Sequence, residues 1–145
     1  MLIRAVTKDD LEEWIGLRGS LWPECSEEEH RAEIEDYFNH TDKLQTFVAQ
    51  ESGRLVGFLE ASLRPFVEDC LSQQVGYIEG WYVDLDHRLK GVGAMLVRAA
   101  EEWARSKGCG EMASDCEITN EVSLAAHLRL RYEETSRLIH FRKNL

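Results

Sequence analysis

The sequence predicts an α/β fold, a single domain over residues 1–145 in which about four helices flank a mixed central sheet. Two patterns predict it. Apolar residues recur at helical spacing in four segments, and short runs rich in strand-forming residues lie between them. Hydrophobic residues make up 43% of the chain, so it can bury a core without disulfides or structural metal ions.

The first part of the chain predicts a strand and two helices. Residues 2–6 form the strand, and apolar residues at helical spacing continue to Pro23, which ends the first helix. Ser26 and Glu29 form a capping box, and this begins a second helix that runs to about residue 39.

The middle of the chain predicts three strands and the most amphipathic helix. A short turn joins strands at residues 44–50 and 54–63, and a longer strand covers residues 74–84. The helix that follows begins near Val92, carries its apolar residues on one face and ends at Gly108.

The last part of the chain predicts a strand, a helix and a final strand. The strand covers residues 111–116, and Asn120 begins a helix that runs to about residue 130. Apolar residues at Leu138, Ile139 and Phe141 predict the final strand. The expected order is therefore β-α-α-β-β-β-α-β-α-β.

The charge of the chain limits its partners. Acidic residues outnumber basic ones by 27 to 17, which gives a formal net charge of −10. Nucleic acids and anionic membrane surfaces attract clusters of Lys and Arg, so we expect neither as a partner. The charge favours a cationic ligand, or it simply keeps the protein in solution.

The four cysteines show no C-x-x-C spacing and no accompanying His cluster, so we expect no metal site. The N-terminus enters a strand pattern without a signal peptide, and no apolar run is long enough to span a membrane. We therefore expect a cytoplasmic protein with reduced thiols.

A glycine-containing turn before the amphipathic helix is the most specific local motif. Its residues are Arg88, Leu89, Lys90, Gly91, Val92 and Gly93. Glycine lets the backbone approach a ligand, and the free amides that begin a helix bind anions, so the turn predicts a pyrophosphate site. A dinucleotide fingerprint would need glycine at Leu96, and a P-loop would need Gly-Lys-Ser/Thr. An ordinary strand-to-helix turn stays open as the alternative.

With this turn the sequence resembles the GNAT acetyltransferase superfamily. That signature reads Arg or Gln, two residues, Gly, one residue, then Gly or Ala, and Arg88, Gly91 and Gly93 fill it. A narrower similarity is to the aminoglycoside 6'-N-acetyltransferases. It is carried by Trp22-Pro23, Glu79-Gly80-Trp81-Tyr82-Val83, Ser114-Asp115-Cys116 and the segment from Asn120 to His127.

The resemblance implies a GNAT fold and direct acetyl transfer, within a ternary complex, from acetyl-CoA to the 6'-amino group of aminoglycoside antibiotics, which confers resistance. It implies that acetyl-CoA contacts Trp81, Tyr82, Val83, Arg88, Leu89, Lys90, Gly91, Val92, Gly93, Ala94 and Asn120. It places the polycationic aminoglycoside against Trp22, Phe66, Glu79, Asp115 and Ser136. It also implies a homodimer, for which an apolar final strand offers an edge.

Three positions depart from the pattern of these acetyltransferases. Phe66 stands where a Tyr is expected, and Ser136 stands where an acidic residue is expected. Arg131-Tyr132 replaces a Gly-Phe pair after the last helix, so we expect Arg131 in the left-handed conformation that glycine adopts freely. These changes bear on substrate preference more than on the chemistry.

Acetyl transfer requires an unprotonated amine, so a carboxylate must position the ammonium group and accept its proton. The candidates are Asp115, on a short strand, and Glu79, within a long apolar strand. An internal salt bridge is the alternative role for each. Charge also develops on the thioester oxygen and needs an N–H donor, for which we expect the backbone amide of Tyr82 or Val83.

Two further side chains have both a functional and a structural interpretation. His127 occupies the position at which many GNAT enzymes place a Tyr that protonates the departing thiolate, but it could simply pack or be solvated. Trp22 could be a platform for an aminosugar ring, or it could belong to the core. The acidic residues between Glu24 and Asp36 are either a solvated helix face or a field that attracts a polycation.

Two other functions stay open from the sequence. One is a GNAT enzyme for another amine, such as a polyamine or a protein amine. The other is a non-catalytic domain that senses acetyl-CoA. Trp22 with Glu79 and Asp115 favours a small polycation over a peptide, whereas binding of acetyl-CoA without turnover would favour the sensor.

Overall fold

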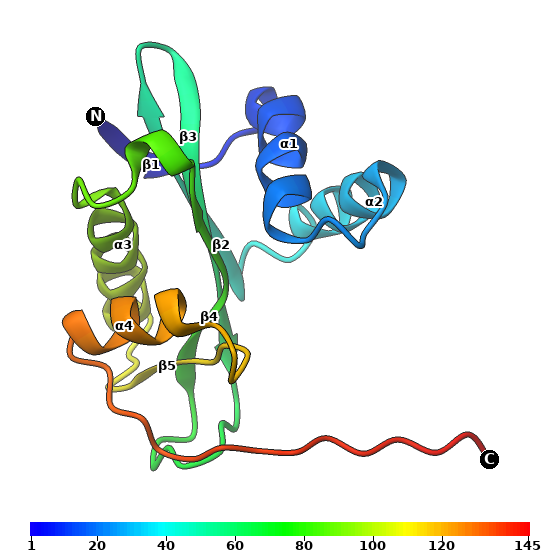
Figure 1. The fold of residues 1–145 in the computed structure, drawn as a ribbon, viewed down its shortest axis with the longest axis vertical. Helices are drawn as coiled ribbons and strands as arrows, with labels where there is room; N and C mark the ends of the chain where they lie inside the picture. The colour runs from blue at the N-terminus through cyan, green and yellow to red at the C-terminus, as the bar shows by residue number, and fades with distance from the viewer.

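A five-stranded sheet forms the centre of the computed structural model, which describes residues 1–145 (Figure 1). The strands lie in chain order across the sheet: β1 (Leu2–Ala5), β2 (Leu44–Glu51), β3 (Arg54–Arg64), β4 (Val75–Val83) and β5 (Met112–Ser114). Neighbours from β1 to β4 are antiparallel, and β5 joins β4 in parallel. The mixed sheet expected from the sequence is therefore confirmed.

Helices cover both faces of this sheet (Figure 1). They are α1 (Leu11–Leu21) and α2 (Glu27–Tyr37) on one face, and α3 (Val92–Ser106) on the other, with α4 (Glu121–Arg129) near β5. Short 3-10 turns, η1 (Lys8–Asp10) and η2 (Leu85–His87), precede α1 and α3. The capping box at Ser26 and Glu29 forms as predicted, with the Glu29 amide donating to Ser26 Oγ at 3.1 Å.

Each face of the sheet has its own core. Leu59 and Val97 belong to the core beneath α3, whereas Phe58 and Trp14 belong to the core beneath α1 and α2. Successive residues of β3 point into opposite cores, which explains why this strand is a nearly continuous apolar run in the sequence.

The predicted final strand is absent, and the expectation was wrong. Residues 132–145 belong to no helix or strand, and Ile139 and Phe141 are 80% and 91% exposed. The segment leaves the rest of the chain as an extended tail (Figure 1). The apolar residues that predicted a strand therefore stay exposed in the single chain.

Arg131, just before the tail, has the expected left-handed conformation, with φ of 67°. Its amide donates to the Leu128 carbonyl at 3.0 Å and closes the end of α4. All four cysteines are free thiols. No helix of the chain combines the length and the apolar character that crossing a membrane requires.

Candidate active site

The two parallel strands β4 and β5 separate shortly after they meet. They pair at only three positions, from Gly76 with Met112 to Ile78 with Ser114. Beyond Ile78, residues Glu79–Val83 of β4 pair with β3 alone, so their other edge is open. This divergence creates a gap in the sheet, and unpaired backbone groups of β4 line one side of it.

Backbone amides at the end of β4 point alternately toward β3 and into this gap. Asp84 donates its amide to the Val56 carbonyl at 2.9 Å, on the β3 side. Because amide directions alternate along a strand, the Tyr82 amide also points to β3, and that of Val83 points to the open edge. Of the two amides considered from the sequence, only that of Val83 therefore suits a ligand in the gap.

A β-bulge lies at Glu79, where the strands separate. Glu60 of β3 pairs with Gly80 and Ala61 pairs with Ile78, so Glu79 is the extra residue of β4. A bulge bends its strand and redirects the side chain at that point. It keeps Glu79 on the same side of the sheet as its second neighbour Tyr77 and exposes its carboxylate instead of burying it.

The glycine-containing turn begins α3 with free backbone donors. The amides of Val92, Gly93 and Ala94 have no hydrogen-bond partner. Gly91 has φ of 83°, a conformation that favours glycine. A Cβ on Gly93 would lie 2.9 Å from Cζ2 of Trp81, so glycine is required there for the helix to approach β4.

Two cofactor-site residues predicted from the sequence, Arg88 and Asn120, have structural partners of their own, whereas Trp81 has an unpaired donor. Arg88 donates from Nε to the Val83 carbonyl at 2.8 Å and so ties the turn to β4. Asn120 caps α4 by accepting from the Ser123 amide at 3.0 Å. The Trp81 indole Nε1 is buried without a hydrogen-bond partner. Free amides, this unpaired donor and the nearby charge of Lys90 fit a ligand that carries phosphate groups.

The two candidate carboxylates lie on the face of the sheet opposite to α3, and Arg64 and Tyr77 together connect them. Arg64 of β3 donates to both oxygens of Glu79, at 2.9 and 2.7 Å, and Ser62 also donates to Glu79 at 2.6 Å. The Arg64 guanidinium lies 3.6 Å from the centre of the Tyr77 ring, whose hydroxyl donates to Asp115.

The alternative role of an internal salt bridge therefore applies to one carboxylate and not to the other. Glu79 is paired with Arg64, whereas Asp115 makes no ion pair. Burial, followed by the hydrogen bond to Asp115, raises the pKa of Tyr77 above the ordinary value of a phenol. Tyr77 consequently stays protonated and donates its hydroxyl to Asp115.

Trp22 packs against the core and stays partly accessible. It ends α1, and its indole lies against Gly80 of β4, where a Cβ would be only 2.4 Å from Cη2. Its ring is also 6.2 Å from that of Phe58 in the core, and the Arg18 guanidinium lies 5.0 Å from it. One side of the indole thus packs, while the half-buried ring stays partly accessible.

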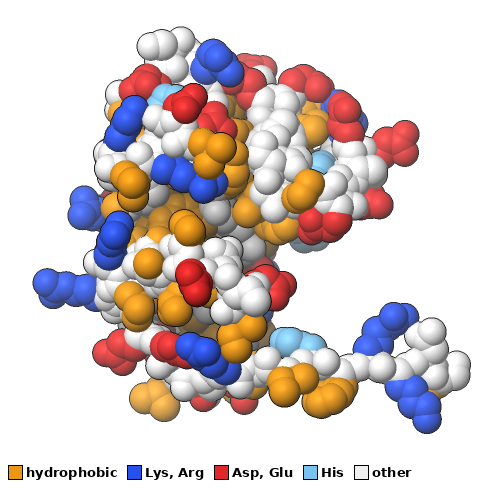
Figure 2. All heavy atoms as spheres, in the orientation of Figure 1, with side chains coloured by type: hydrophobic (Ala, Val, Ile, Leu, Met, Phe, Trp, Pro, Cys, Tyr) orange, Lys and Arg blue, Asp and Glu red, His pale blue; other side chains and the backbone are white.

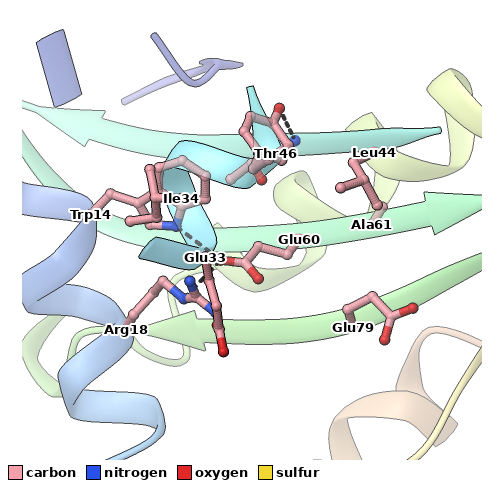
Figure 3. Close-up of a pocket in the computed structure, with 10 residues that line it drawn as sticks. Trp14, Arg18, Glu33, Ile34, Leu44, Thr46, Glu60, Ala61 and Glu79 are labelled. Carbon is pink, nitrogen blue, oxygen red and sulfur yellow. Dashed lines mark hydrogen bonds and ion pairs between the residues drawn. The ribbon is translucent and has the colours of Figure 1, made fainter. Parts of the chain in front are cut away.

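A cavity of about 170 Å³ opens between α1, α2 and the sheet (Figure 3). Glu79 lies at one side of it, apart from a group formed by Arg18, Glu33 and Glu60. Glu60 accepts from Trp14 Nε1 at 3.0 Å and lies 3.2 Å from Arg18 Nε. Burial raises the pKa of Glu60 to about 7, against the opposing effects of Arg18 and Trp14.

His127 lies beside the gap between the strands. Its ring stands edge-on to Trp81 with centroids 5.4 Å apart, and Nε2 is 2.8 Å from Ser114 Oγ. Nδ1 faces the Ser123 carbonyl at 2.7 Å and therefore carries a hydrogen. In the neutral ring, Nε2 accepts from Ser114, so His127 can supply a proton only as an imidazolium.

Phe66 and Ser136 lie at the periphery. Phe66, on the loop after β3, is 71% exposed. Ser136, on the C-terminal tail, donates to Asp69 of the same loop at 2.5 Å. Neither makes a hydrogen bond or an aromatic contact with Trp22, so the structure does not bring these two predicted residues into the group on the sheet.

The sequence reasoning missed several residues of this site, namely Ser62, Arg64, Ser114 and Glu60 as hydrogen-bonding groups. One signal was present for three of them. Glu60, Ser62 and Arg64 follow each other at a spacing of two within β3, which places polar groups on one face of an apolar strand. Ser114 had no comparable signal, because its contact with His127 depends on how α4 packs against β5.

The profile of the acetyltransferase (GNAT) family matches residues 9–132. This chain belongs to the GNAT acetyltransferase family. A curated relative, the aminoglycoside N(6')-acetyltransferase type 1 of Klebsiella aerogenes, is 40% identical over 147 residues, which cover 99% of this chain and 97% of that protein.

Solved structures agree with this GNAT membership over the full chain. AAC(6')-Iy in complex with the bisubstrate analogue CoA-S-monomethyl-acetylneamine has a TM-score of 0.95 and 39% identity, and covers 99% of this chain and 98% of its own. Apo AAC(6')-IG from Acinetobacter haemolyticus has a TM-score of 0.94 and 34% identity, covering 100% and 99%. The GNAT fold expected from the sequence is confirmed.

The Glu60 carboxyl should make the stability of this GNAT domain depend on pH. Its pKa is about 7 in the folded state and ordinarily 4.5, so the folded state holds a proton that the unfolded state lacks between these values. The free energy of unfolding should therefore fall as pH rises from about 4.5 to 7, by roughly 2–3 kcal/mol relative to Glu60→Gln. Denaturant unfolding at several pH values measures this.

Glu33→Gln is the matched control, because it removes the other carboxylate bound to Arg18 and keeps the buried one. It should keep a pH dependence of the same sign, reduced only by the small part of the pKa shift of Glu60 that the charge of Glu33 contributes. Parallel pH profiles for the wild type and Glu60→Gln would show that Glu60 does not titrate in this range.

Proposed function

We propose that this GNAT enzyme transfers the acetyl group of acetyl-CoA to the 6'-amino group of aminoglycosides. Relatives that bear this activity in their names, at about 40% identity over nearly the full chain, support the proposal. So does a solved relative that holds an analogue joining CoA to an acetylated neamine. The observation that carries it in this chain is the gap between β4 and β5, which connects an anion-binding turn to a pair of carboxylates.

The first half of the proposal is the place of acetyl-CoA. The unpartnered amides of Val92–Ala94 and the charge of Lys90 suit its pyrophosphate, since helix N-termini bind anions. The unpaired backbone groups of Glu79–Val83 can form hydrogen bonds with the extended arm of acetyl-CoA, as they would with an additional strand. Acetyl-CoA is a cosubstrate here, supplied in the cytoplasm, which is where we propose that the enzyme acts.

The second half is the place of the aminoglycoside, on the opposite side of the gap. Trp22 offers a half-buried aromatic ring to the sugar, and Glu79 offers a carboxylate to an ammonium group. An incoming ammonium competes with Arg64 for Glu79. Acidic side chains gather over α2, above a hollow that this helix shares with the C-terminal tail (Figure 2), and would attract a polycation.

The proposed chemistry uses groups on both sides of the gap. Asp115, held by Tyr77, accepts a proton from the 6'-ammonium. The amine then attacks the thioester carbon and a C–N bond forms. As the C–S bond breaks, the nitrogen releases a second proton to solvent, which leaves a neutral amide. The Val83 amide donates to the carbonyl oxygen as negative charge develops on it. We propose that His127, as an imidazolium, returns a proton to the thiolate through Ser114.

Regiochemistry tests the proposed function. Mass spectrometry of reactions with acetyl-CoA should show a single acetyl group on the 6' nitrogen of kanamycin or tobramycin. An aminoglycoside with a 6'-hydroxyl should bind competitively but release no free thiol. Acetylation of that compound at another nitrogen, or no product with any aminoglycoside, contradicts the proposal.

Two substitutions separate the roles of the carboxylates. Asp115→Asn should lower kcat about a hundredfold or more, since it removes the proton acceptor. Glu79→Gln should mainly raise KM for the aminoglycoside. Glu117→Gln, which changes an exposed carboxylate without a side-chain partner two residues beyond Asp115, is the control for altered charge. Wild-type kinetics in both site variants at neutral pH would exclude these residues from handling the amine.

We also propose that two copies form a homodimer through the tail. The apolar side chains of Ile139 and Phe141 are largely exposed, so contacts within one chain do not bury them. Strand β5 has only three residues and lies at the edge of the sheet. Its outer side has no neighbouring strand, so an added segment can pair there. If the tail of one copy lies along β5 of the other copy, it covers both the apolar tail residues and the open strand edge.

Charges in the tail test the dimer. Ile139→Asp with Phe141→Asp should convert a dimer to a monomer in multi-angle light scattering at micromolar concentration, because burying two carboxylates at an apolar contact is costly. Leu145→Asp, at the exposed chain end, should leave the dimer intact. A wild-type protein that is monomeric throughout this range refutes the assembly.

A further inference from the structure

Arg18 of α1 is a buried cation that the proposed mechanism does not use. The residue is only 6% exposed, and it lines the cavity between α1, α2 and the sheet on the side away from Glu79 (Figure 3). Moving a charged side chain into a protein interior is costly unless the charge is paired, so arginine is seldom buried without a reason. The contacts of the guanidinium indicate that reason.

Groups from two elements fix the Arg18 guanidinium. Its Nε lies 3.2 Å from a carboxylate oxygen of Glu60 on β3, and its Nη2 donates to Glu33 on α2. Its Nη1 donates to the His30 carbonyl, also on α2, at 3.5 Å. A guanidinium is planar and its N–H groups point in fixed directions, so contacts on several sides set the plane of the group as well as its position.

The guanidinium lies over the ring of Trp22, with Cζ 5.0 Å from the ring centre. Trp22 follows at the end of the same helix, where its amide donates to the Arg18 carbonyl at 2.8 Å. The indole also lies against Gly80, the residue after Glu79, where a Cβ would be 2.4 Å from Cη2. The orientation of the ring beside Glu79 therefore depends on the close fit at Gly80 and on the cation of Arg18.

A cation that already lies over the ring changes what else the ring can bind. The attraction between a cation and an indole comes from the negative π face, which Arg18 already uses. Arg18 repels a second positive charge at the accessible part of the ring. The C–H groups on the face of a pyranose ring pack there by dispersion, without this repulsion. Trp22 therefore suits the uncharged face of a sugar better than it suits an ammonium group.

Ammonium groups have a better position close by. Glu79 and Asp115 present carboxylates on the same face of the sheet, and the contact with Gly80 places Trp22 beside the first of them. The charge of Arg18 is compensated by its own two carboxylates, so at longer range it weakens the attraction of Glu79 for a cation only a little. Sugar ring and ammonium groups thus have separate places.

We propose that Arg18 is a positioning residue for the acceptor substrate. It fixes the Trp22 indole as a surface for the C–H face of an aminopyranose ring, and it directs the ammonium groups of that substrate to Glu79 and Asp115. The inference rests on the proposed aminoglycoside activity and extends it, since it names the face of the sugar that the enzyme recognises. It concerns the acceptor alone and leaves the binding of acetyl-CoA unaffected.

Steady-state kinetics of Arg18→Met test this role. Methionine keeps a long, unbranched side chain and removes the charge. The KM for kanamycin should rise about fivefold or more, because the indole loses the cation that orients it. The KM for acetyl-CoA should not change. Arg31→Met is the matched control, because it removes the same charge and an ion pair between α2 and α1, but Arg31 binds Glu12 and Glu27. It should leave both KM values unchanged.

A double-mutant cycle with Trp22 separates positioning from a merely structural role. Trp22→Leu alone should raise the KM for kanamycin, and Arg18→Met should raise it no further in that background, because Arg18 acts through the indole. A merely structural role predicts additive increases instead, together with a higher KM for acetyl-CoA. Arg18→Lys keeps the charge but loses the planar fork, so it should give an intermediate KM, and it replaces Arg18→Met if that variant does not fold.

The outcomes distinguish this role from the proposed function. An unchanged KM for kanamycin in a folded Arg18 variant, or additive effects in the cycle, overturns the role of Arg18 and leaves the proposed function in place. A wild type that acetylates no aminoglycoside refutes the proposed function, and the role of Arg18 fails with it.

Discussion

The separation of β4 from β5 after Ile78 is the constraint on which the rest of the site depends. Backbone groups of a central strand normally pair on both sides, and here the edge of Glu79–Val83 pairs on one side only. The bulge at Glu79 and the approach of α3 through Gly93 belong to this same stretch of β4. A ligand arm that enters the gap would satisfy the open edge and would reach both faces of the sheet.

The two faces differ in charge, and this difference orders the proposed reaction. On the α3 side, the free amides of the turn and the side chains of Arg98, Arg129 and Arg131, which have no partners, create a positive electrostatic potential. On the other side the electrostatic potential is negative, because Glu79, Asp115 and the acidic residues of α2 lie there. An anionic acetyl donor and a polycationic acceptor are therefore drawn to opposite sides of one sheet, and they meet where the strands separate.

Sequence patterns predicted the parts of this site that depend on local structure. Capping residues, the turn at Gly91 and the left-handed Arg131 follow from backbone chemistry within a few residues, and the structure shows each of them. Contacts between distant elements had no such signal. The pairing of Glu79 with Arg64 requires knowledge of strand register, and the contact of His127 with Ser114 requires the placement of α4. The tail shows the same limit, because its apolar pattern predicted a strand that the single chain does not form.

A structure of the ternary complex with coenzyme A and kanamycin tests the central claim most directly. The thiol of coenzyme A should lie in the gap between β4 and β5, near the Val83 amide and Ser114. The 6'-amine should lie on the opposite face, within hydrogen-bond distance of Asp115, and an ammonium group should replace Arg64 at Glu79. A thiol outside the gap, or a drug bound on the α3 side of the sheet, would contradict the account.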